Sequence, residues 1–398
     1  MNEKLLHTPE GVRDIYDAEC KKKKKVISQI HHVLELYSYQ DIDTPSFEYF
    51  DIFNMDKGSA ASNEMYKFFD RNNNTLVLRP DITPSIARSV AKYYPEEQLP
   101  IRLCYAGNTF LNTHQHQGKL SEFTQIGGEL INDDSSAADA EIIACVIHCL
   151  LAAGLKEFQI EIGEVEFFKG MIEEAGLDDE TEQRIKEYIH SKNFFGLTEF
   201  VNTLEIPEER KTALKSFESL FGGLDMLDHA EKLVTNAASL EAIARMRKVY
   251  TALTSYGYEK YVSFDLSMIN RFNYYTGIVF RGYTYGTGDA IVKGGRYNSL
   301  MEKFGKKAPS VGFAIYVDDL MSAIARNKID VALDYSNVLV LYQKEAIAYA
   351  CKLRAEDQKV ELVRMSRRHD LQEYIDYAHK MHFAKLCYFE AADKITEY

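Results

Sequence analysis

The sequence lacks any run of about 20 apolar residues, the length that a helix needs to cross a lipid bilayer. Its opening residues, MNEKLLHTPEGVRD, also lack the continuous apolar core of a secretory signal. Apolar residues nevertheless make up 46% of the 398 residues, which is enough to bury a large core. We therefore expect a cytoplasmic globular protein of two or three domains that does not associate with membranes.

Metal-binding and disulfide patterns are also missing. The six cysteines form no CxxC pair and no disulfide-like spacing, which fits a reducing compartment. His114 and His116 have no third ligand at a suitable spacing, so we expect no metal site. Because no Walker loop, dinucleotide fingerprint or nucleophile elbow occurs, we expect neither a bound cofactor nor acyl-transfer chemistry.

Positive charge is scarce. The 47 lysines and arginines are outnumbered by 60 aspartates and glutamates, which gives a net charge of −13. Proteins that embrace RNA usually gather positive charge against its phosphates, so the composition argues against such a role. The basic run at residues 21–25 lies in a helix-like segment, where we favour a solvated face over a phosphate site.

The spacing of apolar residues divides the chain into segments. Residues 1–165 and 257–325 mix helical and alternating patterns, whereas residues 166–256 have mostly helical spacing, as expected of a helical insertion. Residues 337–398 read as a small α/β domain. Because strands and helices do not alternate regularly in the interrupted core, we predict an α+β fold with a mostly antiparallel sheet.

The segment LRPDITP (78–84) is the first candidate binding element. Two prolines favour an extended backbone, in which Asp81 and Thr83 point to the same side. A carboxylate beside a hydroxyl suits an ammonium group. The alternative is an Asx-type turn that caps a helix over residues 85–93.

A second candidate is the strand-like segment EFTQIGGELI (122–131). With a period of two, Gln125, Gly127 and Glu129 share one face and form a polar floor for a small ligand. The alternative is the solvent face of an edge strand. A third candidate is Tyr274 with Tyr275, because adjacent tyrosines in a strand alternate faces and one hydroxyl can then enter a pocket.

These segments belong to a set of motifs that resembles the catalytic core of histidyl-tRNA synthetase, a class II aminoacyl-tRNA synthetase. The resemblance covers roughly residues 5–325 and places the helical insertion where that family has one. Seven motifs recur in family order: PEGVRD (9–14), MYKFFDR (65–71), LRPDITP (78–84), FTQIGGE (123–129), NYYTG (273–277), GGRY (294–297) and VGFA (311–314).

Three positions depart from the synthetase pattern. The resemblance places arginines that serve ATP and the reacting phosphate at positions that are here Leu111, Asn270 and Asp319. Removing one such electrostatic contact typically slows catalysis by ~10²–10³-fold. Losing all three, with an anion at Asp319, predicts that the chain does not form the aminoacyl-adenylate.

The amino acid pocket, in contrast, is retained. The resemblance assigns histidine contacts to Asp81, Thr83, Gln125, Glu129, Tyr274 and Tyr275, although synthetases usually have glutamate at the first of these positions. Carboxylates suit the ammonium group, and a carboxylate, amide or phenol suits the imidazole nitrogens.

A core with a histidine pocket and a dismantled ATP site resembles the regulatory-subunit family of ATP phosphoribosyltransferase. The resemblance implies no catalysis by this chain, a short-form catalytic subunit as partner, and a role in the first step of histidine biosynthesis. It further implies a class II-type homodimer, a hetero-octamer with four subunits of each kind, and feedback inhibition by L-histidine. The short segment 337–398 implies no tRNA partner.

Two alternatives remain at this stage. The first is an active histidyl-tRNA synthetase with degenerate ATP motifs, which would need a cation near Leu111 and a complete tRNA-binding domain. The second is a structural partner whose pocket is vestigial.

Overall fold

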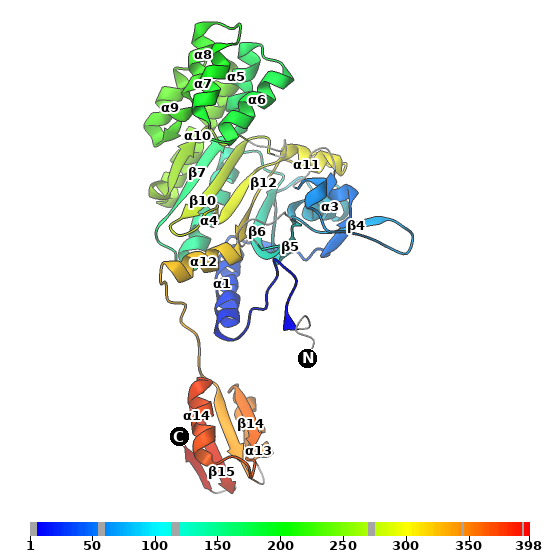
Figure 1. Cartoon of the computed structure of the whole chain (residues 1–398), viewed down its shortest axis with the longest axis vertical. Helices are drawn as coiled ribbons and strands as arrows, with labels where there is room; N and C mark the ends of the chain where they lie inside the picture. Colours follow the sequence, from blue (N-terminus) through cyan, green and yellow to red (C-terminus); the bar gives the residue numbers. More distant parts are fainter. Residues whose placement is uncertain (1–5, 55–59, 113–119, 270–274, 344–345, 392–393) are drawn as a thin grey trace. The chain divides into compact units, whose positions relative to one another are not determined.

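The computed structural model describes residues 6–54, 60–112, 120–269, 275–343, 346–391 and 394–398. It divides the chain into two units, Met1–Val331 and Ala332–Tyr398 (Figure 1). Each unit has its own sheet and its own hydrophobic core.

A nine-stranded sheet forms the centre of the first unit, in the order β1-β5-β6-β12-β11-β10-β7-β9-β8. Neighbouring strands are antiparallel except for β1 with β5 and β7 with β9, which confirms the predicted α+β class. The strands are β1 (Gln40–Asp41), β5 (Ile101–Phe110), β6 (Glu122–Ile131), β7 (Phe158–Glu164), β8 (Phe221–Gly222), β9 (Val262–Asp265), β10 (Ile278–Thr284), β11 (Val292–Arg296) and β12 (Ser310–Tyr316).

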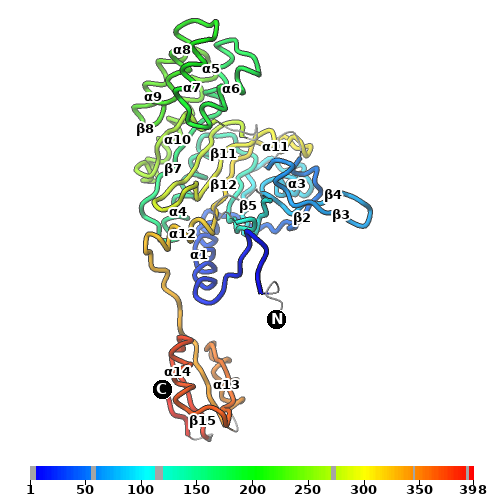
Figure 2. Tube along the Cα trace, in the orientation of Figure 1, coloured from blue at the N-terminus to red at the C-terminus, as the bar shows by residue number. Residues whose placement is uncertain are grey.

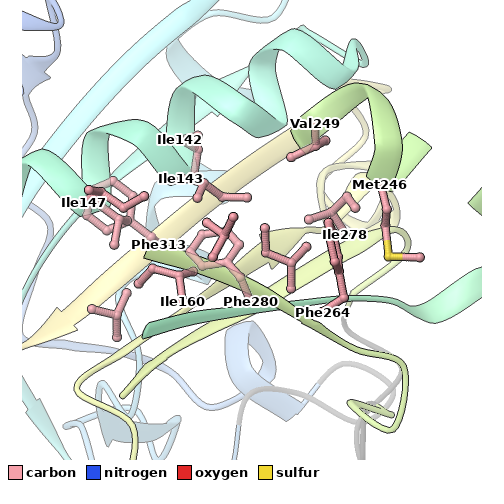
Figure 3. Packing of buried hydrophobic residues seen from close by; sticks show 14 of the residues in the cluster. Ile142, Ile143, Ile147, Ile160, Met246, Val249, Phe264, Ile278, Phe280 and Phe313 are labelled. Atoms are coloured by element: carbon pink, nitrogen blue, oxygen red, sulfur yellow. The ribbon is translucent and has the colours of Figure 1, made fainter. Parts of the chain in front are cut away.

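Three helices pack against the sheet and against one another on one side: α1 (Asp17–Leu36), α4 (Ser136–Ala152) and α10 (Ala237–Tyr256). Apolar residues every three or four positions give α1 and α10 one buried stripe each, whereas α4 is apolar on most sides and is buried between its neighbours. Figure 3 shows α4 and α10 packed on the strands, with these labelled residues: Ile142, Ile143, Ile147, Met246 and Val249 from the helices, and Ile160, Phe264, Ile278, Phe280 and Phe313 from the sheet.

The chain between β7 and β9 is largely helical (Figure 2). Asp178 and Asn193 cap α6 and α7, because their carboxylate and amide oxygens accept backbone N–H groups at the helix starts. No helix in the described part of the chain is both long and apolar enough to cross a membrane. Before α10, the segment contains α5 (Val165–Ala175), α6 (Asp179–His190), α7 (Phe194–Asn202), α8 (Glu208–Lys215), η3 (Ser216–Glu218), β8 and α9 (Leu224–Glu231); η4 (Glu259–Tyr261) follows it.

The opposite face of the sheet carries the short helices α3 (Thr83–Tyr93) and α11 (Asn298–Lys303), which share a hydrophobic cluster with β5. This cluster borders the face on which Glu129 lies. A small antiparallel sheet, β2-β4-β3, precedes α3. Its elements and their neighbours are β2 (Phe47–Tyr49), α2 (Asp51–Asn54), η2 (Ser62–Glu64), β3 (Lys67–Phe69) and β4 (Thr75–Leu78); α12 (Val317–Arg326) follows β12.

The second unit is a four-stranded sheet in the order β14-β13-β15-β16, covered by one helix on each face. Alternate residues of β13 face α13 and α14, so this strand is apolar on both sides, as in parallel sheets generally. Its elements are β13 (Val338–Tyr342), α13 (Ile347–Ala355), β14 (Val360–Arg364), α14 (Leu371–Lys380), β15 (Lys385–Ala391) and β16 (Lys394–Glu397).

Candidate functional site

The centre of the site is β6, which lies inside the sheet between β5 and β12. The edge-strand alternative is therefore wrong for this segment. Gln125 and Glu129 point to the same face, as their spacing predicts, and are 3% and 1% exposed. A polar pair on the floor of a covered sheet must find partners in the protein or in a ligand.

The Glu129 carboxylate accepts two hydrogen bonds. Thr83 donates its hydroxyl to Oε1 at 2.7 Å, and Tyr297 donates its hydroxyl to Oε2. Gly312, opposite Glu129 on β12, makes room for this carboxylate, since a Cβ atom there would lie 1.6 Å from Oε2. The carboxylate is thus held in one orientation by residues from three separate elements.

Burial sets the electrostatics of this carboxyl group. Desolvation raises the pKa of Glu129 to about 8, with a contribution from the nearby Asp81, although the hydrogen bonds from Tyr297 and Thr83 oppose the shift. Burial also raises the pKa of Asp81, against two backbone N–H groups that stabilise its charge. Two carboxyl groups in this setting favour a cationic ligand that supplies N–H donors.

The prediction of an extended segment at Asp81 and Thr83 is wrong in part. Ile82 has helical backbone angles, and α3 begins at Thr83 because Pro84 is well tolerated in the first helical turn. Asp81 Oδ1 accepts the Ile82 N–H at 2.7 Å, as in the turn-like alternative. Both side chains still reach the Glu129 region, so the turn positions them there.

Gln125 and Tyr275 complete the described part of the pocket. Gln125 Oε1 is buried and has no hydrogen-bond partner among the described residues. Burial raises the pKa of Tyr275, and the charges of Asp81 and Glu129 raise it further. Tyr274 lies outside the described residues. We call this group the Glu129 pocket: Asp81, Thr83, Gln125, Glu129, Tyr275 and Tyr297.

Tyr297 was missed by the sequence analysis, although GGRY was recognised as a motif. The sequence did hold a signal for it, because adjacent residues in a strand point to opposite faces of the sheet. Side chains at the end of a strand alternate, and Arg296 points to the α4 side, where it pairs with Asp139 at 2.8 Å. Tyr297 is therefore directed to the opposite face, toward Glu129.

The structure describes two of the three positions predicted to have lost phosphate contacts, Leu111 and Asp319. Leu111 packs against an apolar cluster that contains Phe53 and Val77. Asp319 is exposed in the first turn of α12, and Asn270 lies outside the described residues. In the basic run of α1, Lys23 pairs with Asp318 at 2.7 Å, so this ammonium group is already neutralised.

One group of three possible metal ligands occurs in the described part of the chain. His31, Asp41 and Cys104 offer ligand atoms within 4.8 Å of one another near the β1 edge of the sheet. Burial raises the pKa of Cys104 to about 12, so without a bound ion the thiol is protonated. His114 and His116 lie outside the described residues.

Comparison with known proteins places these features in a family. The sequence profile of the histidyl-tRNA synthetase family matches residues 11–320. The ATP phosphoribosyltransferase regulatory subunit of Acetivibrio thermocellus is 41% identical over 345 residues, which cover 87% of this chain and 82% of that protein. The regulatory subunit of the same name from Ruminiclostridium cellulolyticum is 39% identical over 397 residues, covering 99% and 94%.

Solved structures agree in fold. A crystal structure from Bacillus halodurans, described as an ATP phosphoribosyltransferase regulatory subunit/histidyl-tRNA synthetase, has a TM-score of 0.87 and 31% identity, covering 98% of this chain and 99% of that one. A histidyl-tRNA synthetase from Nostoc sp. PCC 7120 has a TM-score of 0.80 at 20% identity, covering 99% and 96% of the two chains. The second likeness concerns the fold alone.

Proposed function

Since the chain belongs to the family of ATP phosphoribosyltransferase regulatory subunits, we propose that it regulates that enzyme in histidine biosynthesis by binding L-histidine in the Glu129 pocket. It acts on a short-form catalytic subunit, which needs it for activity, and it transmits inhibition by histidine. It does not aminoacylate tRNA itself.

One observation carries the ligand assignment: buried Glu129 is oriented by Thr83 and Tyr297 beside the unpartnered Gln125 Oε1. Buried polar atoms without partners are uncommon in proteins, and a ligand is one way to satisfy them. Histidine offers an ammonium group and an imidazole N–H, and both can donate to carboxylate and amide oxygens. Asp81 and Glu129 supply the carboxylates.

The surroundings of the pocket argue against adenylate chemistry. Transfer at phosphorus needs fixed cations where negative charge develops. The corresponding described positions carry the apolar Leu111 and the acidic Asp319. The same fold therefore serves as a sensor, in which histidine acts by binding more tightly to one state of the complex than to the other.

The assembly part of the proposal is a class II-type homodimer that joins the catalytic subunit as a hetero-octamer of four and four. Size-exclusion chromatography with light scattering measures both masses, first of the chain alone and then with the partner. A monomeric chain, or a complex of another stoichiometry, would overturn this part while leaving histidine binding untouched.

The first experiment is calorimetric titration of the full chain with L-histidine and, separately, with Mg-ATP. We expect saturable binding of histidine, no measurable binding of ATP and no histidine-dependent release of pyrophosphate. Glu129→Gln should weaken histidine binding at least tenfold, because it removes the charged acceptor. Glu173→Gln, on the exposed side of α5, is the matched control and should bind normally.

Two outcomes would reject the proposal. ATP binding with histidine-dependent release of pyrophosphate would show that the chain is an active histidyl-tRNA synthetase. Unchanged histidine affinity in Glu129→Gln would mean that the Glu129 pocket is vestigial and that the chain is a structural partner.

A further inference from the structure

A cavity of about 400 Å³ lies between the helical segment and the sheet. Its walls come from α6 and α7, from the η3 region and from strands β7, β9 and β10. None of its described lining residues belongs to the Glu129 pocket. The two sites lie close in sequence, because Ile269 lines the cavity and Tyr275 belongs to the pocket.

The cavity contains a carboxylate and a guanidinium that do not bond to each other. Glu161 on β7 and Arg281 on β10 are directly opposite in the antiparallel ladder, so both side chains point to the cavity face. Both are half-buried. Among the described residues, neither side chain makes a hydrogen bond or an ion pair, although the charge of Arg281 opposes the desolvation that raises the pKa of Glu161.

Among the other charged groups of the cavity, Lys192 and Asp265 pair with each other, and Glu218 is exposed. Lys192 donates to Ser267 at 2.7 Å and lies 3.5 Å from Asp265. Arg281 and Glu161 are therefore the pair that can accept a ligand with an anionic end and a cationic end. A guanidinium holds a carboxylate through two parallel hydrogen bonds, and a carboxylate accepts from an ammonium.

The remaining walls are largely apolar and aromatic. Phe194 and Phe217 line the side formed by the helical segment, and Met268 lines the side formed by the sheet. Flat rings pack favourably against such walls. The cavity volume lies within the range of ordinary small-molecule sites.

We propose that this cavity is a second ligand site, which takes a zwitterionic amino acid with an aromatic or heteroaromatic side chain. Arg281 binds the ligand carboxylate, Glu161 binds the ammonium group, and the ring packs against Phe194 and Phe217. This site extends beyond the proposed regulation through the Glu129 pocket and does not depend on it.

The test uses the full chain carrying Glu129→Gln, so that binding at the first pocket does not mask the second. L-histidine, L-phenylalanine and L-tyrosine are titrated by calorimetry. We expect at least one of them to bind, and Arg281→Gln to weaken that binding about 10–100-fold, in line with the loss of a charged hydrogen-bond pair. Arg247→Gln, in the same helical segment, is the control and should not change the affinity.

A second test changes the ligand and leaves the protein unchanged, so it does not depend on whether a variant folds. The amide of the amino acid that binds lacks the anionic carboxylate, so it should bind at least tenfold more weakly to the same protein. Absence of binding by all three amino acids would overturn the proposal. Binding would also overturn the proposal if Arg281→Gln and Glu161→Gln left the affinity unchanged and the amide bound as tightly as the amino acid. Each result can occur whether or not Glu129 binds histidine.

Discussion

The buried carboxyl group of Glu129 couples ligand binding to protons. Because its pKa is about 8, the empty pocket holds it mostly protonated at pH 7. An entering cation favours the charged carboxylate, so we expect about one proton to be released per histidine bound at pH 7, and fewer as the pH rises through 8. Calorimetry in buffers with different heats of ionisation measures this number.

The matched variant for this prediction is Glu129→Gln, which retains a hydrogen-bonding group of similar size but cannot titrate. It should bind weakly and release fewer protons than the wild type. If the wild type binds histidine with no buffer dependence of the measured heat, Glu129 is already ionised in the empty pocket.

A substitution at Gly312 tests whether the position of the Glu129 carboxylate determines the shape of the pocket. Gly312→Ala would place a Cβ atom 1.6 Å from Glu129 Oε2, so the carboxylate must move. We expect histidine affinity to fall at least tenfold, as measured by calorimetry. Gly288→Ala is the control, because a Cβ atom there meets nothing within 4 Å. Equal affinities of the two variants would show that Glu129 does not set the pocket.

At the level of secondary structure, one ionic cluster joins α4, α10 and β11. Asp139 accepts the Arg245 Nε–H at 2.7 Å and the Arg296 Nε–H at 2.9 Å. Asp139 and Arg296 are buried, so Asp139→Ala leaves the guanidinium without its buried counter-charge and with only the exposed Asp134 at 3.3 Å. We expect the free energy of unfolding to fall by about 3–5 kcal/mol.

Chemical denaturation measures this loss. The control is Asp228→Ala, whose partner Arg247 lies on the surface, and it should cost less than about 1 kcal/mol. A loss as small for Asp139→Ala as for the control would mean that water or another carboxylate compensates Arg296.

The strands around Glu129 show which features of the site could be predicted from the sequence and which could not. The period of two predicts that Gln125 and Glu129 share a face, and they do. The period does not reveal that β12, encoded far along the chain, covers the outer edge of β6. The hydroxyl of Tyr297 reaches Glu129 through this long-range pairing, so local spacing alone did not single it out. Similarly, the start of α3 depended on backbone angles that two prolines leave open.

At the scale of the whole molecule, the two units have separate cores and should unfold separately. Leu341 is fully buried in β13 of the second unit. We expect Leu341→Ala to destabilise that unit by about 2–5 kcal/mol and to leave the transition of the first unit in place. Urea unfolding followed by circular dichroism separates the two transitions, and a shift of both would indicate one cooperative molecule.

The strand order also means that β6 is synthesised long before one of the two strands that pair with it. The β5–β6 hairpin is complete at Ile131, but β12, which pairs with the other side of β6, begins about 180 residues later at Ser310. At about 5–20 residues per second, the ribosome needs roughly 10–40 seconds to supply it. Throughout that interval the nascent chain carries an open β6 edge with Gln125 and Glu129 on it, so ribosome-bound chaperones have a defined window in which to act.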